Sequence, residues 1–185
     1  TTLPRADHCT HVAGIIAPTQ YSTGIPGVAP KVKIMPVEVF NGEYADAYSI
    51  AQGIIYAANN GAKVLNLSLG SYYYNEYIDA SVQYAHNKGA VIVAAAGNDD
   101  IDYPTYPAAL YHVLAVSATN KEDRITYFSN YGNYINFSAP GESIYSSVKG
   151  SSYNYMDGTS MASPVVSGVA ALILSKNQWL SPNQV

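Results

Sequence analysis

Apolar and polar positions alternate along the chain with a period that changes repeatedly between two and about 3.6 residues. Short apolar or β-branched runs bounded by Gly, Asn or Asp predict strands. They cover residues 32–40, 63–69, 90–96, 113–118 and 134–137. Apolar residues at helical spacing predict helices. Four helices are predicted, at residues 8–17, 47–60 and 76–87 and along the apolar run 165–174. The polar segment just before residue 165 opens the last of them.

Strands that alternate with helices favour a parallel sheet, because each parallel crossover needs a connection long enough to form a helix. The predicted fold class is therefore α/β, a mostly parallel twisted sheet with helices on both faces. No linker or internal repeat divides residues 1–185, which predicts a single domain. Ligands of such sheets bind beyond the carboxyl ends of the strands. Those ends carry Ser68-Leu69-Gly70 and Gly97-Asn98.

Composition excludes several classes of protein and site. The longest apolar stretches are far shorter than a bilayer span, so we expect no transmembrane segment. A net charge of -4, with nine scattered Lys and Arg residues, gives no electrostatic footprint for nucleic acid or an anionic membrane. The single cysteine, Cys9, excludes an intrachain disulfide and any cysteine-built metal site.

Tyrosine is unusually abundant, with 18 residues that include the cluster 72–74. Tyrosines can line a binding cleft or an interaction face, because they offer contact area at low entropic cost. The more ordinary interpretation is a tyrosine-rich solvent surface.

The segment Gly158 to Pro164, G-T-S-M-A-S-P, allows two interpretations of Ser160. A serine at a helix start can cap the helix, and Pro164 suits a first helical turn. Alternatively, Ser160 is a nucleophile held where the backbone donors and dipole of a helix start converge. Acyl transfer also needs an imidazole to take the serine proton and a fixed donor for the oxyanion. His8 and Asn98 are of those types and fall at predicted element ends.

Four motifs decide between these interpretations when taken together. They are H-C-T-H-V-A-G at 8–14, N-L-S-L-G at 66–70, A-A-A-G-N at 94–98 and G-T-S-M-A-S-P at 158–164. In this order, and almost from end to end, the chain resembles the subtilisin-like serine proteases. The resemblance implies a three-layer fold, a secreted and monomeric serine endopeptidase, and an extended peptide or protein as substrate.

The resemblance also implies a role for each matching residue. His8 matches the general base, Ser160 the nucleophile, and Asn98 the side-chain donor of the oxyanion hole, with the Ser160 N–H as the second donor. The residues that match the primary specificity pocket are Ser68, Leu69, Gly70, Ala95, Ala96 and Gly97. Glu43, Tyr44 and Ala45 lie near the segment that pairs with an extended substrate as an added strand. His11 is expected to support packing, and His86 and His112 to be structural.

The chain departs from the family pattern at the third catalytic residue, an aspartate upstream of the histidine. Only seven residues precede His8, and Asp7 is adjacent to it and badly placed to accept from its imidazole. We therefore expect a partial peptidase domain that is truncated at both ends, lacks the strand with the aspartate and the closing helices, and is nearly inactive alone. The alternative is a catalytically inactive domain that binds peptides or protein partners.

Two further departures concern Cys9 and metal binding. Cys9 stands where the family has glycine, which we expect to weaken activity. The loop Thr19 to Ile25 matches a structural calcium site, but Tyr21 stands where an asparagine ligand is usual. Asn136 weakens a second cation site, where some relatives carry an aspartate. We expect no metal at the catalytic site and no cofactor in the chemistry, and the residues at both candidate positions disfavour a structural calcium.

Overall fold

Four parallel strands form the centre of the fold in the computed structural model, which describes residues 5–18, 24–42 and 44–185. They are β1 (Val64–Leu67), β2 (Val91–Ala95), β3 (Val113–Thr119) and β4 (Phe137–Pro140), paired in that order. The strands predicted at 63–69, 90–96 and 113–118 are thereby confirmed.

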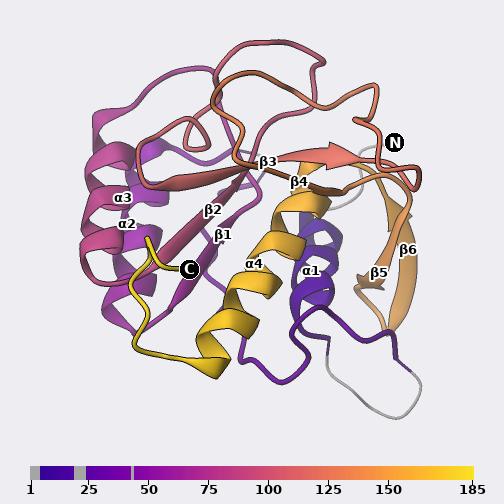
Figure 1. The fold of residues 1–185 in the computed structure, drawn as a ribbon, viewed down its shortest axis with the longest axis horizontal. Helices are drawn as coiled ribbons and strands as arrows, with labels where there is room; N and C mark the ends of the chain where they lie inside the picture. The colour runs from indigo at the N-terminus through magenta and orange to yellow at the C-terminus, as the bar shows by residue number, and fades with distance from the viewer. Residues whose placement is uncertain (1–4, 19–23, 43) are drawn as a thin grey trace.

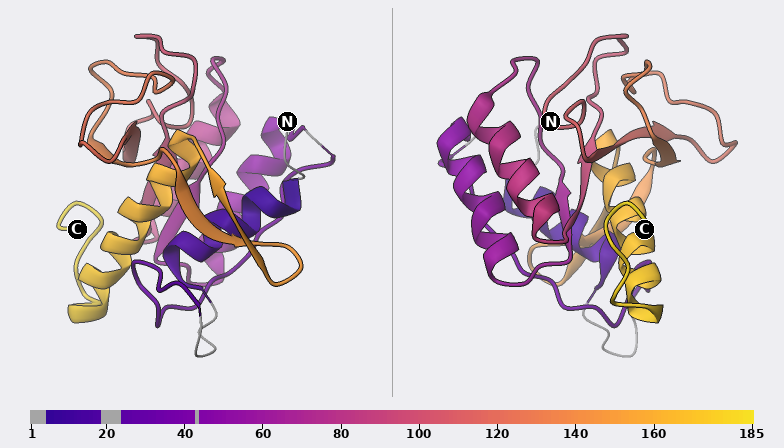
Figure 2. Two further views of the ribbon diagram at one scale, coloured as in Figure 1. Left: turned by 90° about the vertical axis from the view of Figure 1, so that its right-hand side faces the viewer. Right: turned by 60° about the vertical axis from the view of Figure 1, so that its left-hand side comes forward.

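Helices cover both faces of this sheet (Figures 1 and 2). On one face lie α2 (Ala47–Asn59) and α3 (Glu76–Asn87), packed against each other. On the other lies α4 (Thr159–Lys176), which contacts all four strands, with α1 (Arg5–Ile16) beside it. The predicted α/β fold with helices on both faces is confirmed.

The two cores follow from the two-residue period of β2. Ile92 and Ala94 belong to the cluster under α2 and α3, whereas Val91 and Val93 belong to the cluster under α4. All five residues of the strand are buried. A strand that is apolar at every position is typical of a sheet covered on both sides.

Side chains cap both helices of the first face. Asp46 accepts a hydrogen bond from the Ser49 N–H at 2.8 Å, and this bond lowers the pKa of Asp46. Asn75 accepts from the N–H groups of Tyr77 and Ile78 at the start of α3. The caps begin the helices where the apolar spacing predicts them.

Helix α4 is long and apolar enough, by length and composition, to cross a membrane. Half of it is buried inside the protein against the sheet and α1. A single helix of this kind is weak evidence for a membrane segment, because the central helix of a globular core meets the same criterion.

Two strand predictions were wrong. Residues 32–40 form no strand, and Ile34 and Met35 are exposed. Alternation predicts an extended segment, but it cannot supply the partner strand that a ladder requires. The strand predicted at 134–137 begins only at Phe137, because the Ile135 N–H closes a turn onto the Gly132 carbonyl.

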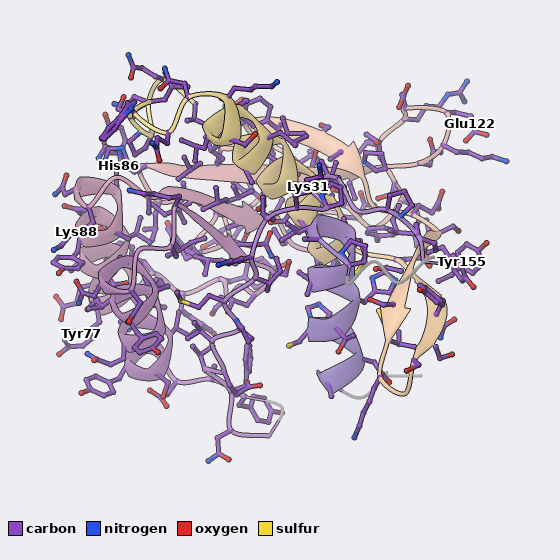
Figure 3. All side chains as sticks on the ribbon, turned by 90° about the horizontal axis from the view of Figure 1, so that it is seen from below. Lys31, Tyr77, His86, Lys88, Glu122 and Tyr155 are labelled. Atoms are coloured by element: carbon purple, nitrogen blue, oxygen red, sulfur yellow. The ribbon has the colours of Figure 1, made fainter. Side chains whose placement is uncertain are left out.

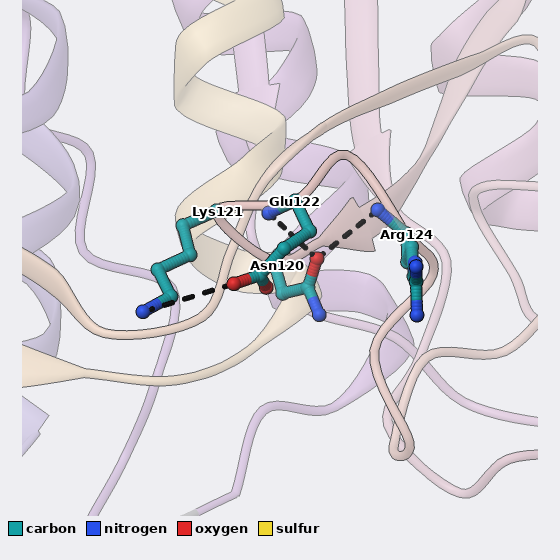
Figure 4. Close-up of polar contacts among 4 residues, drawn as sticks. All are labelled: Asn120, Lys121, Glu122 and Arg124. Carbon is teal, nitrogen blue, oxygen red and sulfur yellow. Dashed lines mark hydrogen bonds and ion pairs between the residues drawn. The ribbon is translucent and has the colours of Figure 1, made fainter.

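An antiparallel hairpin of β5 (Ile144–Val148) and β6 (Ser152–Met156) was not predicted. The signal available was Lys149-Gly150-Ser151 between two alternating runs, and its Gly150 and Ser151 have positive φ. A turn follows β3, and a hydrogen bond from the Asp123 N–H to the Asn120 carbonyl closes it at 3.1 Å. The Asn120 side chain accepts from the N–H groups of Glu122 and Arg124, both at 3.0 Å (Figure 4).

Tyrosines cover much of the surface, as the more ordinary interpretation of their abundance expects. Tyr77 on α3 and Tyr155 on β6 are exposed on different elements at opposite sides of the molecule (Figure 3). Tyr72 is an exception, because it is half-buried and lines a cavity described below.

His11 joins α1 to the hairpin, which confirms its predicted supporting role. It is fully buried, and its Nε2 lies 2.9 Å from the Ile144 carbonyl oxygen and 3.1 Å from that of Asn154. Both partners are acceptors, so Nε2 carries the proton. Burial lowers the pKa of His11, and the two carbonyl hydrogen bonds oppose this in part.

The lowered pKa of His11 predicts a loss of stability in mild acid. The unfolded chain binds the proton more tightly, so stability is complete above about pH 6.5 and falls as the pH drops toward the lower folded pKa. His11→Gln should flatten this dependence, leaving the part due to His112, whose pKa burial also lowers. Thermal unfolding of the wild type and of His11→Gln between pH 8 and pH 5, followed by circular dichroism, checks this. An equal dependence of Tm on pH in the two proteins would contradict it.

Candidate active site

The carboxyl ends of β1 and β2 and the start of α4 meet at one edge of the sheet. The strands are parallel and in register, with Leu67 opposite Ala94. The segments that follow them therefore leave the sheet side by side, and α4 packs against both strands. This edge is where the predicted ligand positions lie.

Ser160 is the second residue of α4, and the cap of that helix is Gly158. The interpretation of Ser160 as a capping residue was wrong, and Pro164 stands beyond the first turn. Gly158 has φ 149° and ψ 156°, a conformation that is essentially restricted to glycine. N–H groups of a first helical turn have no acceptor within the helix, so the Ser160 N–H is available to bind an acceptor outside it.

The Asn98 side chain is held in one orientation by Thr159. Its Oδ1 accepts from the Thr159 N–H at 2.8 Å and from the Thr159 hydroxyl at 2.9 Å. The Thr159 hydroxyl in turn accepts from the Gly97 N–H at 3.1 Å. Because a backbone N–H can only donate, the acceptor must be the amide oxygen. The donating Nδ2 of the exposed Asn98 thereby lies beside the start of α4, 3.6 Å from where a Cβ on Gly158 would stand.

A cavity of about 290 Å³ opens beside these donors. Four residues of the predicted specificity pocket line it, together with the predicted catalytic residues Asn98 and Ser160. The complete lining is Leu69, Gly70, Ser71, Tyr72, Ala95, Gly97, Asn98, Asp99, Thr105, Thr159 and Ser160. The volume suits one side chain rather than a large ligand.

Ser68 and Ala96, also predicted for the pocket, are not among its lining residues. The Ser68 hydroxyl donates to the Ser160 carbonyl at 2.9 Å. That carbonyl lacks its usual helical partner because Pro164, four residues on, has no N–H. The carbonyl of the fully buried Ala96 accepts from Thr105, Asn130 and Tyr134. Both residues therefore bind groups next to the cavity without lining it themselves.

His8 lies in the first turn of α1 and is half-buried. Helices α1 and α4 pack side by side, and both begin at the upper end of the view in Figure 1. His8 does not line the cavity, and its role as the base stays a prediction. The Asp7 Oδ1 accepts from the Lys149 N–H at 2.9 Å, which ties the start of α1 to the hairpin turn.

The remaining predicted positions carry less information. Glu43 and residues 19–23 of the predicted calcium loop lie outside the described residues. Tyr44 is 82% exposed and pairs with Asn41, and neither it nor Ala45 lines the cavity. Within the described part of the chain, no group of three or more His, Cys, Asp or Glu residues could hold a metal ion.

Five lining residues were not predicted as site residues: Ser71, Tyr72, Asp99, Thr105 and Thr159. Three of them, Ser71, Asp99 and Thr159, directly adjoin predicted site residues in the sequence. Proximity to the motifs could therefore have found them. Thr105 carries no such signal, because tertiary packing alone brings it to the Ala96 carbonyl.

Comparisons with known proteins agree with this geometry. The model of the Subtilase family matches residues 2–185. Thermitase of Thermoactinomyces vulgaris is 46% identical over 176 residues, which are 94% of this chain and 63% of that protein. A thermophilic serine proteinase of Bacillus sp. (strain AK1) is 47% identical over 93% of this chain and 43% of its own length. The chain thus spans about half to two thirds of these relatives.

Solved structures show the same likeness. A cold adapted subtilisin-like serine proteinase superposes with a TM-score of 0.88 at 37% identity, covering 96% of this chain and 64% of that one. Sphericase gives a TM-score of 0.89 at 35% identity, over 98% and 67% of the two chains. The family match, the shared fold and the cavity at the expected sheet edge lead to one conclusion: the chain belongs to the subtilase family.

Proposed function

We propose that this chain carries the nucleophile and oxyanion hole of a serine endopeptidase. The observation that supports this most directly is the arrangement around Asn98. Thr159 fixes the amide oxygen with two hydrogen bonds, and the amide N–H groups are left at the mouth of a cavity that Ser160 also lines. A donor that is oriented before the substrate arrives stabilises a developing oxyanion without reorganisation.

The reaction follows from these groups. The Ser160 Oγ attacks the carbonyl carbon of a peptide bond while His8 takes its proton as general base. The oxygen of the tetrahedral intermediate accepts hydrogen bonds from Asn98 Nδ2 and the Ser160 N–H. His8 then gives the proton to the departing amine, and water releases the acyl group from Ser160. Each group is an amino-acid side chain or a backbone N–H, so no cofactor takes part.

The substrate is a peptide or protein segment in an extended conformation. One side chain enters the cavity, and backbone pairing near residues 43–45 holds the chain that precedes it. Action outside the cell and as a monomer rests on the family resemblance. No observation favours the alternative of a catalytically inactive binding domain.

Labelling by a fluorophosphonate tests the nucleophile. The full-length protein should be labelled once, at Ser160, and Ser160→Ala should abolish the label, because only an activated serine attacks the reagent. Ser175→Ala is the matched control, since that serine lies on the same helix, is exposed and does not line the cavity. Intact-mass spectrometry reads the result, and a label that persists in Ser160→Ala would refute the assignment.

Asn98→Ala should lower turnover by about 10²–10³ with little change in KM, because an oxyanion donor acts in the transition state. This magnitude was established in subtilisin, a member of the same family. Steady-state kinetics on a chromogenic peptide measure it. A loss confined to KM would assign Asn98 to substrate binding instead.

Thr159→Val should lower turnover by about three- to tenfold, the effect of one lost hydrogen bond. The valine keeps the backbone N–H on Asn98 Oδ1 but loses the hydroxyl that fixes it. Thr159→Ser retains the hydroxyl and should recover most of the activity. Equal activity of the two variants would show that the hydroxyl does not position Asn98.

A further inference from the structure

The cavity beside Ser160 holds one carboxylate. Among the described residues that line it, Asp99 is the only acid, and none is Lys, Arg or His. Asp99 comes from the segment after β2, whereas Tyr72 reaches the cavity from the segment after β1. An unmasked carboxylate in such a place would attract a cationic side chain.

The Tyr72 hydroxyl donates a hydrogen bond to Asp99 Oδ2 and so joins the two segments. The Tyr72 ring packs edge to face on Tyr103, with the ring centroids 5.8 Å apart. Burial and the hydrogen bond to Asp99 raise the pKa of Tyr72, so its hydroxyl keeps its proton at neutral pH. The phenol is therefore a permanent donor to the carboxylate.

Asn130 forms hydrogen bonds with both Tyr72 and Asp99. It is fully buried, its Oδ1 accepts from the Asp99 N–H at 2.8 Å, and its Nδ2 lies 3.4 Å from the Tyr72 hydroxyl oxygen. The same Nδ2 donates to the Ala96 carbonyl at 3.2 Å. Since the hydroxyl accepts from Asn130, its own hydrogen is directed to Asp99.

We propose that the Tyr72 hydroxyl is a specificity-determining group, which binds Asp99 and withholds the carboxylate of the cavity from the substrate. The proposal rests on the proposed function, in which the side chain preceding the cleaved bond enters this cavity. A carboxylate that already accepts a hydrogen bond from a phenol attracts an entering ammonium group less strongly than a carboxylate without that hydrogen bond does. The cavity therefore prefers an uncharged side chain to lysine or arginine.

Tyr72→Phe tests this, because it removes the hydroxyl and keeps the ring against Tyr103. Two peptide substrates that differ only in having norleucine or lysine before the cleaved bond isolate the ammonium group. The ratio of kcat/KM for lysine over norleucine should rise about 1.5- to fivefold in the variant, the range for a partly exposed ion pair. An unchanged ratio would overturn the proposal.

Tyr74→Phe is the matched control. The Tyr74 hydroxyl donates to Asp79 Oδ2 at 2.8 Å, and its ring packs edge to face on Tyr106 at 5.6 Å. It makes the same two interactions but does not line the cavity, so the ratio should stay at the wild-type value. Adding Asp99→Asn to Tyr72→Phe should cancel the gain for lysine, and a gain that persists would show that Asp99 is not its source.

A binding measurement separates this proposal from the proposed function. Peptides that end in lysine or norleucine are titrated calorimetrically into the full-length Ser160→Ala protein, with and without Tyr72→Phe. The hydroxyl should weaken binding of the lysine peptide by the same factor, whether or not the wild-type protein cleaves peptides. A shift without any cleavage would refute only the proposed function. The inference would be overturned if Tyr72→Phe left the affinity for the lysine peptide unchanged. It would also be overturned if neither peptide bound.

Discussion

The candidate site depends on the pair of hydrogen bonds by which Thr159 holds the amide oxygen of Asn98. They join the end of the central strand β2 to the first turn of α4. A backbone N–H and a hydroxyl bind the same oxygen, so the amide of this cavity-lining residue has one orientation. Gly158 makes this contact accessible, because its backbone conformation turns the chain into α4 without a side chain in the way.

A second polar network holds α4 to β1, on the other side of the same turn. The Asn66 Oδ1 accepts from the hydroxyls of Ser163 and Ser167, at 2.8 and 2.9 Å. Its Nδ2 donates to the Ser68 hydroxyl, which donates to the Ser160 carbonyl that Pro164 leaves without a helical partner. Buried polar groups are stabilising only when each has a partner, and here every polar atom of Asn66 is used. Ser160 is thus carried on a helix turn that side chains from β1 and from the segment after β2 hold in place.

The rim of the cavity is organised differently. Here the Tyr72 hydroxyl donates a hydrogen bond to the exposed Asp99 carboxylate, and the buried Asn130 forms hydrogen bonds with both residues. Tyr72 therefore has a specific contact at the cavity, which distinguishes it from the tyrosines that only cover the surface. One phenol acts as a hydrogen-bond donor in a site, while others, such as Tyr77 and Tyr155, cover solvent-facing helices and strands.

The sequence by itself determined the alternation of strands and helices, the parallel sheet and the family. These follow from hydrophobic period and from motifs that are local in the chain, such as the buried run of β2 and the segment from Gly158 to Pro164. Only the tertiary structure decided that 32–40 lacks a strand partner and that 144–156 forms a hairpin. It also decided that Ser68 and Ala96 stand behind the cavity while Tyr72, Asp99 and Thr105 line it. Such facts depend on which distant groups meet, and hydrogen bonds such as that from Ser68 to Ser160, 92 positions apart, leave no periodic signal in a sequence.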